Sequence, residues 1–143
     1  MKIRHVGITV RDIDKSLYFY RDILGFTVVR EMNESGRFID DISGLNNVKV
    51  NTVKLNTPSQ NGGMIELLCY ESHTSSVHHD PIFKCGISHF ALTVENIDEI
   101  YKKLSSENIV FNCKPKISDD GGAKVTFCRD FENNLIELVE VLS

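Results

Sequence analysis

The chain lacks a long apolar segment, an excess of basic residues and a secretory signal. A membrane-spanning helix needs about 20 consecutive apolar residues, and no run of that length occurs in the 143 residues. The 16 lysines and arginines are outnumbered by 20 aspartates and glutamates, giving a net charge of −4, whereas nucleic-acid-binding surfaces are clustered and basic. The opening "MKIRHVGITV" has no signal-peptide core. We therefore expect a cytoplasmic protein with neither a membrane nor a nucleic-acid partner.

The four cysteines also lack the spacing of a metal or redox motif. No two of them form the C-x-x-C pattern that such sites use. Cys69 lies inside the apolar run "MIELLCY", where a small buried apolar residue is the simpler interpretation. We assign no function to any cysteine.

What the chain does contain is an internal repeat. The segment "IRHVGITVRDIDKSLYFY" (3–20) aligns without gaps with "ISHFALTVENIDEIYKKL" (87–104), and the alignment pairs His5 with His89. Each copy begins with the alternation typical of a half-buried strand and continues with apolar residues at helical spacing. The expected core faces of the two helices are Ile13, Leu17, Tyr20 and Leu24 in the first copy, and Ile97, Ile100, Tyr101 and Leu104 in the second.

Each half also ends in a predicted strand that contains Ile-Glu-Leu, in "MIELLCY" and "LIELVEV". Between the helix and this strand we expect "FTVVREM", "GRFIDDI" and "VKVNTVKL" as strands in the first half, and "IVFNCKP" and "KVTFCRD" in the second. The polar segment between the halves contains Pro81 and Gly86 and is interpreted as a linker. The sequence thus predicts one α+β domain over 1–143, with βαβββ-type modules at 1–70 and 87–143 and a linker at 71–86.

Two histidines and two glutamates occupy matching places in these modules. Strand side chains alternate between two faces, and the more apolar face is expected to pack on the helix. This places His5 and His89 on the opposite face. Glu66 and Glu137 alternate with the inward-facing apolar residues of their own strands, so they are expected on that opposite face as well. The four side chains are therefore predicted to project from one concave sheet surface.

Two imidazoles and two carboxylates suit a divalent metal ion that keeps open positions for water or substrate. A single strand histidine is more often a hydrogen-bonded structural residue, and a single strand glutamate usually faces solvent. Recurrence at matching places in two repeats favours the metal site instead. We predict that His5, Glu66, His89 and Glu137 bind one divalent ion.

These motifs resemble the vicinal oxygen chelate superfamily, which includes glyoxalase I, methylmalonyl-CoA epimerase, extradiol dioxygenases, fosfomycin-resistance enzymes and bleomycin-binding proteins. The segments that carry the resemblance are "HVGITVRDIDKSLYFYRDILGF", "MIELLCY", "ISHFALTVENIDEIYKKL" and "RDFENNLIELVEV". The resemblance implies a glyoxalase-like fold, in which a mixed sheet curls around a metal held by the four residues above. It also implies a small-molecule substrate and a homodimer. Nickel, cobalt, zinc, manganese and iron all suit the ligand set.

A His/Glu/His/Glu set is most similar to that of bacterial glyoxalase I, a lactoylglutathione lyase. It implies an isomerase, epimerase or lyase that acts on a small carbonyl substrate through a metal-stabilised enolate. We expect Glu137 to be the catalytic base, with Glu66 as its partner across the metal. The alternatives are an iron(II) extradiol-type dioxygenase using His5, His89 and Glu137, a thiol-transferring resistance enzyme, and a non-catalytic small-molecule binding or resistance protein.

The chain departs from this family at three places. By this resemblance, Thr9 stands where glyoxalase I has a basic residue that binds the glutathione carboxylate. Glutathione is therefore not implied as a cosubstrate. Asn133 replaces the glycine of the turn before the last strand, and asparagine also tolerates a left-handed backbone. The insert at 37–50 differs from compact glyoxalases, and its Asp40 and Asp41 are interpreted as solvated.

The linker is rich in histidine, in "HTSSVHHDP". His73, His78 and His79 are interpreted either as exposed residues of a flexible linker or as part of a lid that supplies an acid or a substrate contact.

Overall fold

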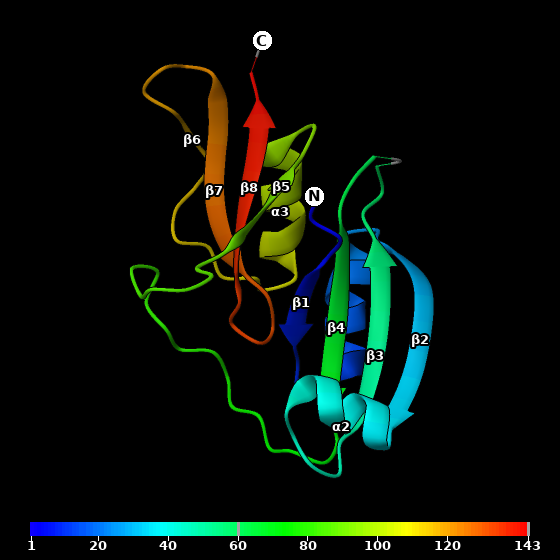
Figure 1. Ribbon diagram of the computed structural model, residues 1–143. Coiled ribbons are helices and arrows are strands. Elements are labelled where there is room, and N and C mark those ends of the chain that lie inside the picture. Colours follow the sequence, from blue (N-terminus) through cyan, green and yellow to red (C-terminus); the bar gives the residue numbers. More distant parts are fainter. Residues whose placement is uncertain (60, 143) are drawn as a thin grey trace. The chain divides into compact units, whose positions relative to one another are not determined.

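The computed structural model describes residues 1–59 and 61–142 (Figure 1). The chain divides into two compact units, Met1–Val77 and His78–Ser143, and the boundary falls inside the expected linker. Each unit contains one four-stranded mixed sheet together with its helices, which confirms the α+β class. Within the described residues, no helix is long and apolar enough to cross a membrane.

The first unit has its strands in the order β1-β4-β3-β2, with β1 parallel to β4 and the other neighbours antiparallel. Figure 1 shows the first helical segment against one face of this sheet. The elements are β1 (Val6–Thr9), α1 (Ile13–Leu17), the π-helical turn η1 (Tyr18–Ile23), β2 (Thr27–Ser35), α2 (Arg37–Ser43), β3 (Lys49–Asn56) and β4 (Met64–Tyr70).

The first helix buries a different face from the one expected. Tyr20 is fully buried as predicted, but Leu17 and Leu24 are only half-buried, and Phe19 and Ile23 occupy the core in their place. The reason is that η1 is π-helical. An i→i+5 turn holds more residues than an α-helical turn, so the residues after Leu17 point in directions that a 3.6-residue period does not predict.

The predicted strand "GRFIDDI" is wrong, because this segment forms the helix α2. Gly36 and Gly44, with φ of 95° and 71°, bound it in backbone conformations that favour glycine. Its apolar residues also fit helical spacing, and a window this short does not separate the two periods. Ile39 is the buried residue of α2.

Asp40 is not simply solvated, as the sequence suggested. Its carboxylate accepts hydrogen bonds from the backbone N–H groups of Asn47 at 3.1 Å and Val48 at 2.8 Å. Ile39 packs with Val48 and Val50, and Leu68 and Tyr70 contact the same cluster. The insert is therefore fastened to β3 and β4 by both polar and apolar contacts.

The second unit repeats the topology, with strand order β5-β8-β7-β6 and β5 parallel to β8. Its helix begins after the N-cap Asn96, whose side chain accepts from the N–H of Glu99, and it buries Ile97 and Leu104 as predicted. The elements are β5 (Phe90–Thr93), α3 (Ile97–Ser106), β6 (Lys116–Ile117), β7 (Ala123–Arg129) and β8 (Leu135–Val141).

The predicted strand "IVFNCKP" is also wrong. Phe111 makes one isolated bridge to Cys128, and regular pairing begins only with the two-residue β6. Pro115 precedes β6 and has no N–H to donate to a ladder, which agrees with the interruption of pairing here.

Candidate functional site

The first histidine–glutamate pair lies on one sheet of the first unit. β1 and β4 run parallel with Gly7 opposite Glu66, and His5 is two residues before Gly7, so it shares the Glu66 face. The Nε2 atom of His5 lies 2.9 Å from Oε2 of Glu66. The side chains of His5 and Glu66 are 27% and 14% exposed, so both are held close to the sheet.

The second unit reproduces this arrangement. Ala91 of β5 stands opposite Glu137 of β8, and His89 is two residues before Ala91. The Nε2 atom of His89 lies 3.3 Å from Oε2 of Glu137, with the two side chains 31% and 25% exposed. The small partners Gly7 and Ala91 are exposed in their respective units, so no bulky side chain stands directly beside either carboxylate on the β1 side of Glu66 or the β5 side of Glu137.

The predicted face is therefore confirmed for each pair within its own unit. The structure brings His5 to Glu66 and His89 to Glu137. Across residues 1–59 and 61–142, no three histidine, cysteine, aspartate or glutamate side chains form a group that could hold a metal ion. The four-ligand metal site remains a prediction.

The chemistry of each pair fits a divalent cation. A metal-binding imidazole uses one ring nitrogen for the ion while a second group holds the other nitrogen. The Nδ1 atom of His89 is 2.8 Å from the Ser88 hydroxyl, which leaves Nε2 beside Glu137. Nδ1 of His5 is buried and has no hydrogen-bond partner among the described residues, so His89 shows this second contact and His5 does not. Each unit thus presents imidazole nitrogen and carboxylate oxygen, two donors that bind divalent transition metals.

The residue on the other side of each glutamate differs between the units. Here a row means the residues that stand opposite one another on adjacent strands of one sheet. Lys54 of β3 stands opposite Glu66, and its Nζ atom is 3.3 Å from Oε1 of Glu66. Phe127 of β7 stands opposite Glu137, and its ring meets the His89 ring edge-on with centroids 5.1 Å apart. Sequence reasoning missed Lys54, because its position beside Glu66 follows from strand register. The two glutamates therefore have unlike surroundings.

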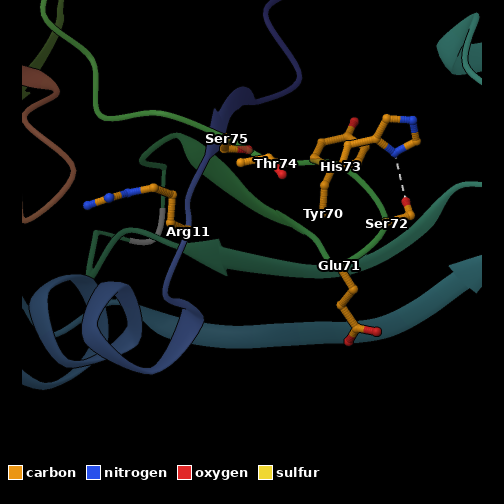
Figure 2. Close-up of a pocket in the computed structure, with 7 residues that line it drawn as sticks. All are labelled: Arg11, Tyr70, Glu71, Ser72, His73, Thr74 and Ser75. Carbon is orange, nitrogen blue, oxygen red and sulfur yellow. Dashed lines mark hydrogen bonds between the residues drawn. The ribbon is translucent and has the colours of Figure 1, made fainter.

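A hollow of about 280 Å³ lies elsewhere in the first unit, where β1 and β4 end (Figure 2). Figure 2 shows Arg11 on one side and the hydrogen-bonded pair Ser72 and His73 on the other, with Glu71 pointing away from both. None of the four predicted ligands lines it. Its lining residues are Arg11, Tyr70, Glu71, Ser72, His73, Thr74 and Ser75.

The linker histidines lie in distinct surroundings. His73 lines the hollow and bonds Ser72 through Nδ1 at 2.8 Å. The carbonyl of His78 accepts a hydrogen bond from the side-chain amide of Asn133. Asn133 has φ of 68°, so the left-handed backbone expected at this position is confirmed. A lid function for these histidines stays a prediction.

Comparisons with known proteins agree with this architecture. The family model of the glyoxalase/bleomycin resistance protein/dioxygenase superfamily matches residues 2–138. The lactoylglutathione lyase of Schizosaccharomyces pombe is 30% identical over 152 residues, which covers 96% of this chain but 47% of that enzyme. The chain therefore spans about half the length of this relative. A probable lactoylglutathione lyase of Synechocystis is 29% identical over 144 residues, covering 100% of this chain and 98% of the relative.

Solved structures show the same fold. A glyoxalase family protein from Bacillus cereus superposes with a TM-score of 0.89 at 22% identity, covering 100% of this chain and 95% of that chain. The fosfomycin resistance protein FosX of Listeria monocytogenes, in complex with Mn(II) and sulfate, superposes with a TM-score of 0.66 at 13% identity, covering 99% and 93%. The family-model match over most of the chain, the repeated sheets and these neighbours agree. The chain belongs to the glyoxalase/bleomycin resistance protein/dioxygenase superfamily.

Proposed function

We propose that this protein is a divalent-metal-dependent isomerase, epimerase or lyase of the glyoxalase I and methylmalonyl-CoA epimerase type, acting on a small carbonyl substrate. The observation that carries the proposal is the repeated histidine–glutamate pair, at the same register in both sheets. The similarity to a lactoylglutathione lyase and to a probable lactoylglutathione lyase supports the class of reaction. The manganese complex of FosX supports a metal in this fold.

In this proposal His5, Glu66, His89 and Glu137 bind one ion, either within one chain or across the two chains of a homodimer. Nickel, cobalt, zinc, manganese and iron all accept imidazole and carboxylate ligands. A divalent ion at this site would polarise a substrate carbonyl and make the neighbouring C–H more acidic. The two imidazoles act as neutral ligands, and the carboxylates also supply the charge that balances the ion.

Glu137 is the carboxylate better suited to move the substrate proton. Glu66 is held at both oxygens, by His5 at Oε2 and by Lys54 at Oε1. Glu137 pairs with His89 alone among the described residues and is the more exposed of the two, 25% against 14%. A base must reach the carbon it deprotonates. Glu137 therefore takes the proton, and Glu66 remains its partner carboxylate.

Metal content per chain is the first test. Tag-free protein purified without chelator and measured by elemental mass spectrometry is expected to carry about one divalent ion, because four donors of this kind fix an ion strongly. Glu66→Ala and Glu137→Ala should each lose most of it, whereas Glu95→Ala, at an exposed position, should keep it. Wild-type protein that stays metal-free after reconstitution with each of the five metals contradicts the proposal.

Turnover then tests the base. Methylglyoxal with glutathione or other thiols is the first substrate set to assay, given the two lyase relatives. Glu137→Gln should lower kcat by about 10²-fold or more, since a positioned base contributes about 10²–10⁴-fold. Full turnover in Glu137→Gln that retains its metal would remove Glu137 as the base.

One observation favours a second candidate, an iron(II) extradiol-type dioxygenase. If Lys54 keeps Glu66 away from the ion, His5, His89 and Glu137 remain as the two-histidine, one-carboxylate set of such enzymes. Glu66→Ala would then retain iron, and a catecholic substrate would give iron-dependent oxygen consumption. Loss of metal from Glu66→Ala rejects this candidate.

A further inference from the structure

We propose that Lys54 is the receptor for an anionic group of the substrate, so that the site selects carbonyl compounds that carry a carboxylate or a similar oxyanion. This inference rests on the proposed metal site, because it concerns how Lys54 is neutralised once Glu66 binds a metal ion. Lys54 is not among the four predicted ligands. The inference is drawn from the residues that surround it in the first sheet.

The first observation is that Lys54 is held within the sheet by its neighbours. Its side chain is only 20% exposed, and lysine is seldom so enclosed without an anionic partner. The adjacent Val53 and Leu55 are both fully buried on the opposite face, so β3 is firmly fixed at this point. The ammonium group therefore stays close to Glu66, with Nζ 3.3 Å from Oε1.

The second observation is the surplus of positive charge across this row of the sheet. Lys54 pairs with Glu66 of β4 on one side and with Arg30 of β2 on the other. The register of β2 shifts between Val28 and Arg30, and this irregularity brings Arg30 opposite Lys54; like charges at paired positions are unfavourable. One carboxylate thus stands against two cations. Arg30 is exposed, which leaves its charge accessible to an incoming anion.

The second unit shows that this surplus is not a general property of the repeat. The matching row there contains Ala91, Glu137 and Phe127, which carry one negative charge and no positive one. The short β6 pairs with Val125 and Lys124 instead of Phe127. The repeat therefore conserves the imidazole and the carboxylate but places a cation beside only one of the two carboxylates. Binding a metal through histidines and glutamates does not require a cation beside one of the carboxylates, whereas binding an anion does.

Metal binding and anion binding then reinforce one another. With a divalent ion bound to Glu66, this carboxylate would no longer neutralise Lys54, and Lys54 would then lie close to a second cation. Two positive groups at short range repel, and an oxyanion placed beside them relieves the repulsion. A substrate that offers one oxygen to the ion and an oxyanion to Lys54 would satisfy both cations, and charge-assisted hydrogen bonds of this kind are among the stronger ones.

The test compares two probes that differ by a carboxylate. The cobalt(II)-loaded protein is titrated with acetohydroxamic acid and with the monohydroxamic acid of succinate, and the dissociation constants are read from the cobalt absorption spectrum. In the wild type the carboxylate-bearing probe should bind about tenfold tighter or more, from one charged hydrogen bond. In Lys54→Met the ratio of the two constants should fall to about one, and in Lys54→Arg it should be retained.

Lys49→Met is the matched control. Lys49 belongs to the same strand but has the opposite parity to Lys54 and is exposed, so its loss should leave the ratio unchanged. Lys54→Gln provides a second charge-removing variant if Lys54→Met is unstable. The ratio compares two probes on the same cobalt-loaded variant, so a change in metal affinity does not affect it.

Equal ratios in the wild type and Lys54→Met, or a wild-type ratio near one, would overturn the inference while leaving the metal site intact. A wild type that binds no cobalt would overturn the proposed function and, with it, the function of Lys54. The charge-removing variants should also bind cobalt more tightly than the wild type, because a cation that competes for Glu66 has been removed.

Discussion

The Ser88 hydroxyl lies 2.8 Å from Nδ1 of His89, so the other ring nitrogen, Nε2, faces the Glu137 carboxylate 3.3 Å away. Groups that hold the second nitrogen of a metal-binding histidine fix its orientation, and losing them weakens metal binding by about 10–100-fold. Ser88→Ala should therefore weaken divalent-metal binding by about tenfold, measured by titration against a competing chelator.

Ser72 provides a matched control for this prediction. Its hydroxyl makes the same 2.8 Å contact with Nδ1 of His73, which is not a predicted ligand. Ser72→Ala should leave metal affinity unchanged. If the two variants bind metal equally well, Ser88 does not position a ligand, and the case for His89 as one is weakened.

A second prediction concerns the cap of α3. The Glu140 carboxylate accepts a hydrogen bond from the backbone N–H of Ile97 at 2.8 Å, and negative charge at a helix N-terminus is favourable. Glu140→Leu should lower the free energy of unfolding by about 1–2 kcal/mol, measured by urea denaturation. Glu140 has the opposite parity to Glu137 on β8, so metal content should not change. An effect no larger than that of Glu95→Leu, at an exposed position, would contradict this prediction.

A third prediction concerns the left-handed residue in the turn before β8. Asn133 has φ of 68°, and its side-chain amide donates to the carbonyl of His78. Asn133→Ala loses this hydrogen bond and also strains the backbone, so unfolding should become easier by about 1–2 kcal/mol. Asn133→Gly loses only the hydrogen bond and should be the less destabilised of the two. If urea denaturation shows Asn133→Gly to be less stable than Asn133→Ala, the left-handed backbone conformation is not the main source of the destabilisation.

A fourth prediction concerns thiol reactivity. Burial, together with the nearby charge of Asp130, raises the pKa of the Cys128 thiol to about 12. Cys85 and Cys113 are exposed. At pH 8 a disulfide reagent should modify Cys85 and Cys113 readily and reach Cys128 only after unfolding, because the thiolate is the reactive form. Rapid modification of Cys128 in the native protein would show that its surroundings open.

The same shift predicts how stability depends on pH. An unfolded cysteine has a pKa of about 8.5, so between that value and about 12 the unfolded chain releases the Cys128 proton while the folded chain keeps it. The free energy of unfolding should therefore decrease as pH rises through this range. Urea denaturation between pH 8 and 10 should show a steeper decrease for the wild type than for Cys128→Ala. Parallel curves would exclude Cys128 as the cause.

Strand periodicity made it predictable that each unit carries its histidine and its glutamate on one face of its sheet. A period of two assigns a face without knowledge of the partner strand, and the repeat supplied the same assignment twice. The α+β class, the core residues Ile97 and Leu104, and the turn at Asn133 followed from equally local signals. The errors lie where local patterns have two solutions. Residues 37–43 fit a helix as well as a strand, and the π-helical turn η1 shifts a face that helical spacing alone places elsewhere.

The sequence by itself determined the repeated modules, their buried strands and the sheet face that carries the histidine and the glutamate of each module, because alternation is set by neighbouring residues and the recurrence can be found by comparing the two halves. Only the tertiary structure decided that Lys54 stands beside Glu66 and Phe127 beside Glu137, and that Glu140 caps a helix 43 residues earlier in the chain. These contacts depend on strand register and on how a helix packs on its sheet. Both are set by the combined packing of many residues, which no local pattern records.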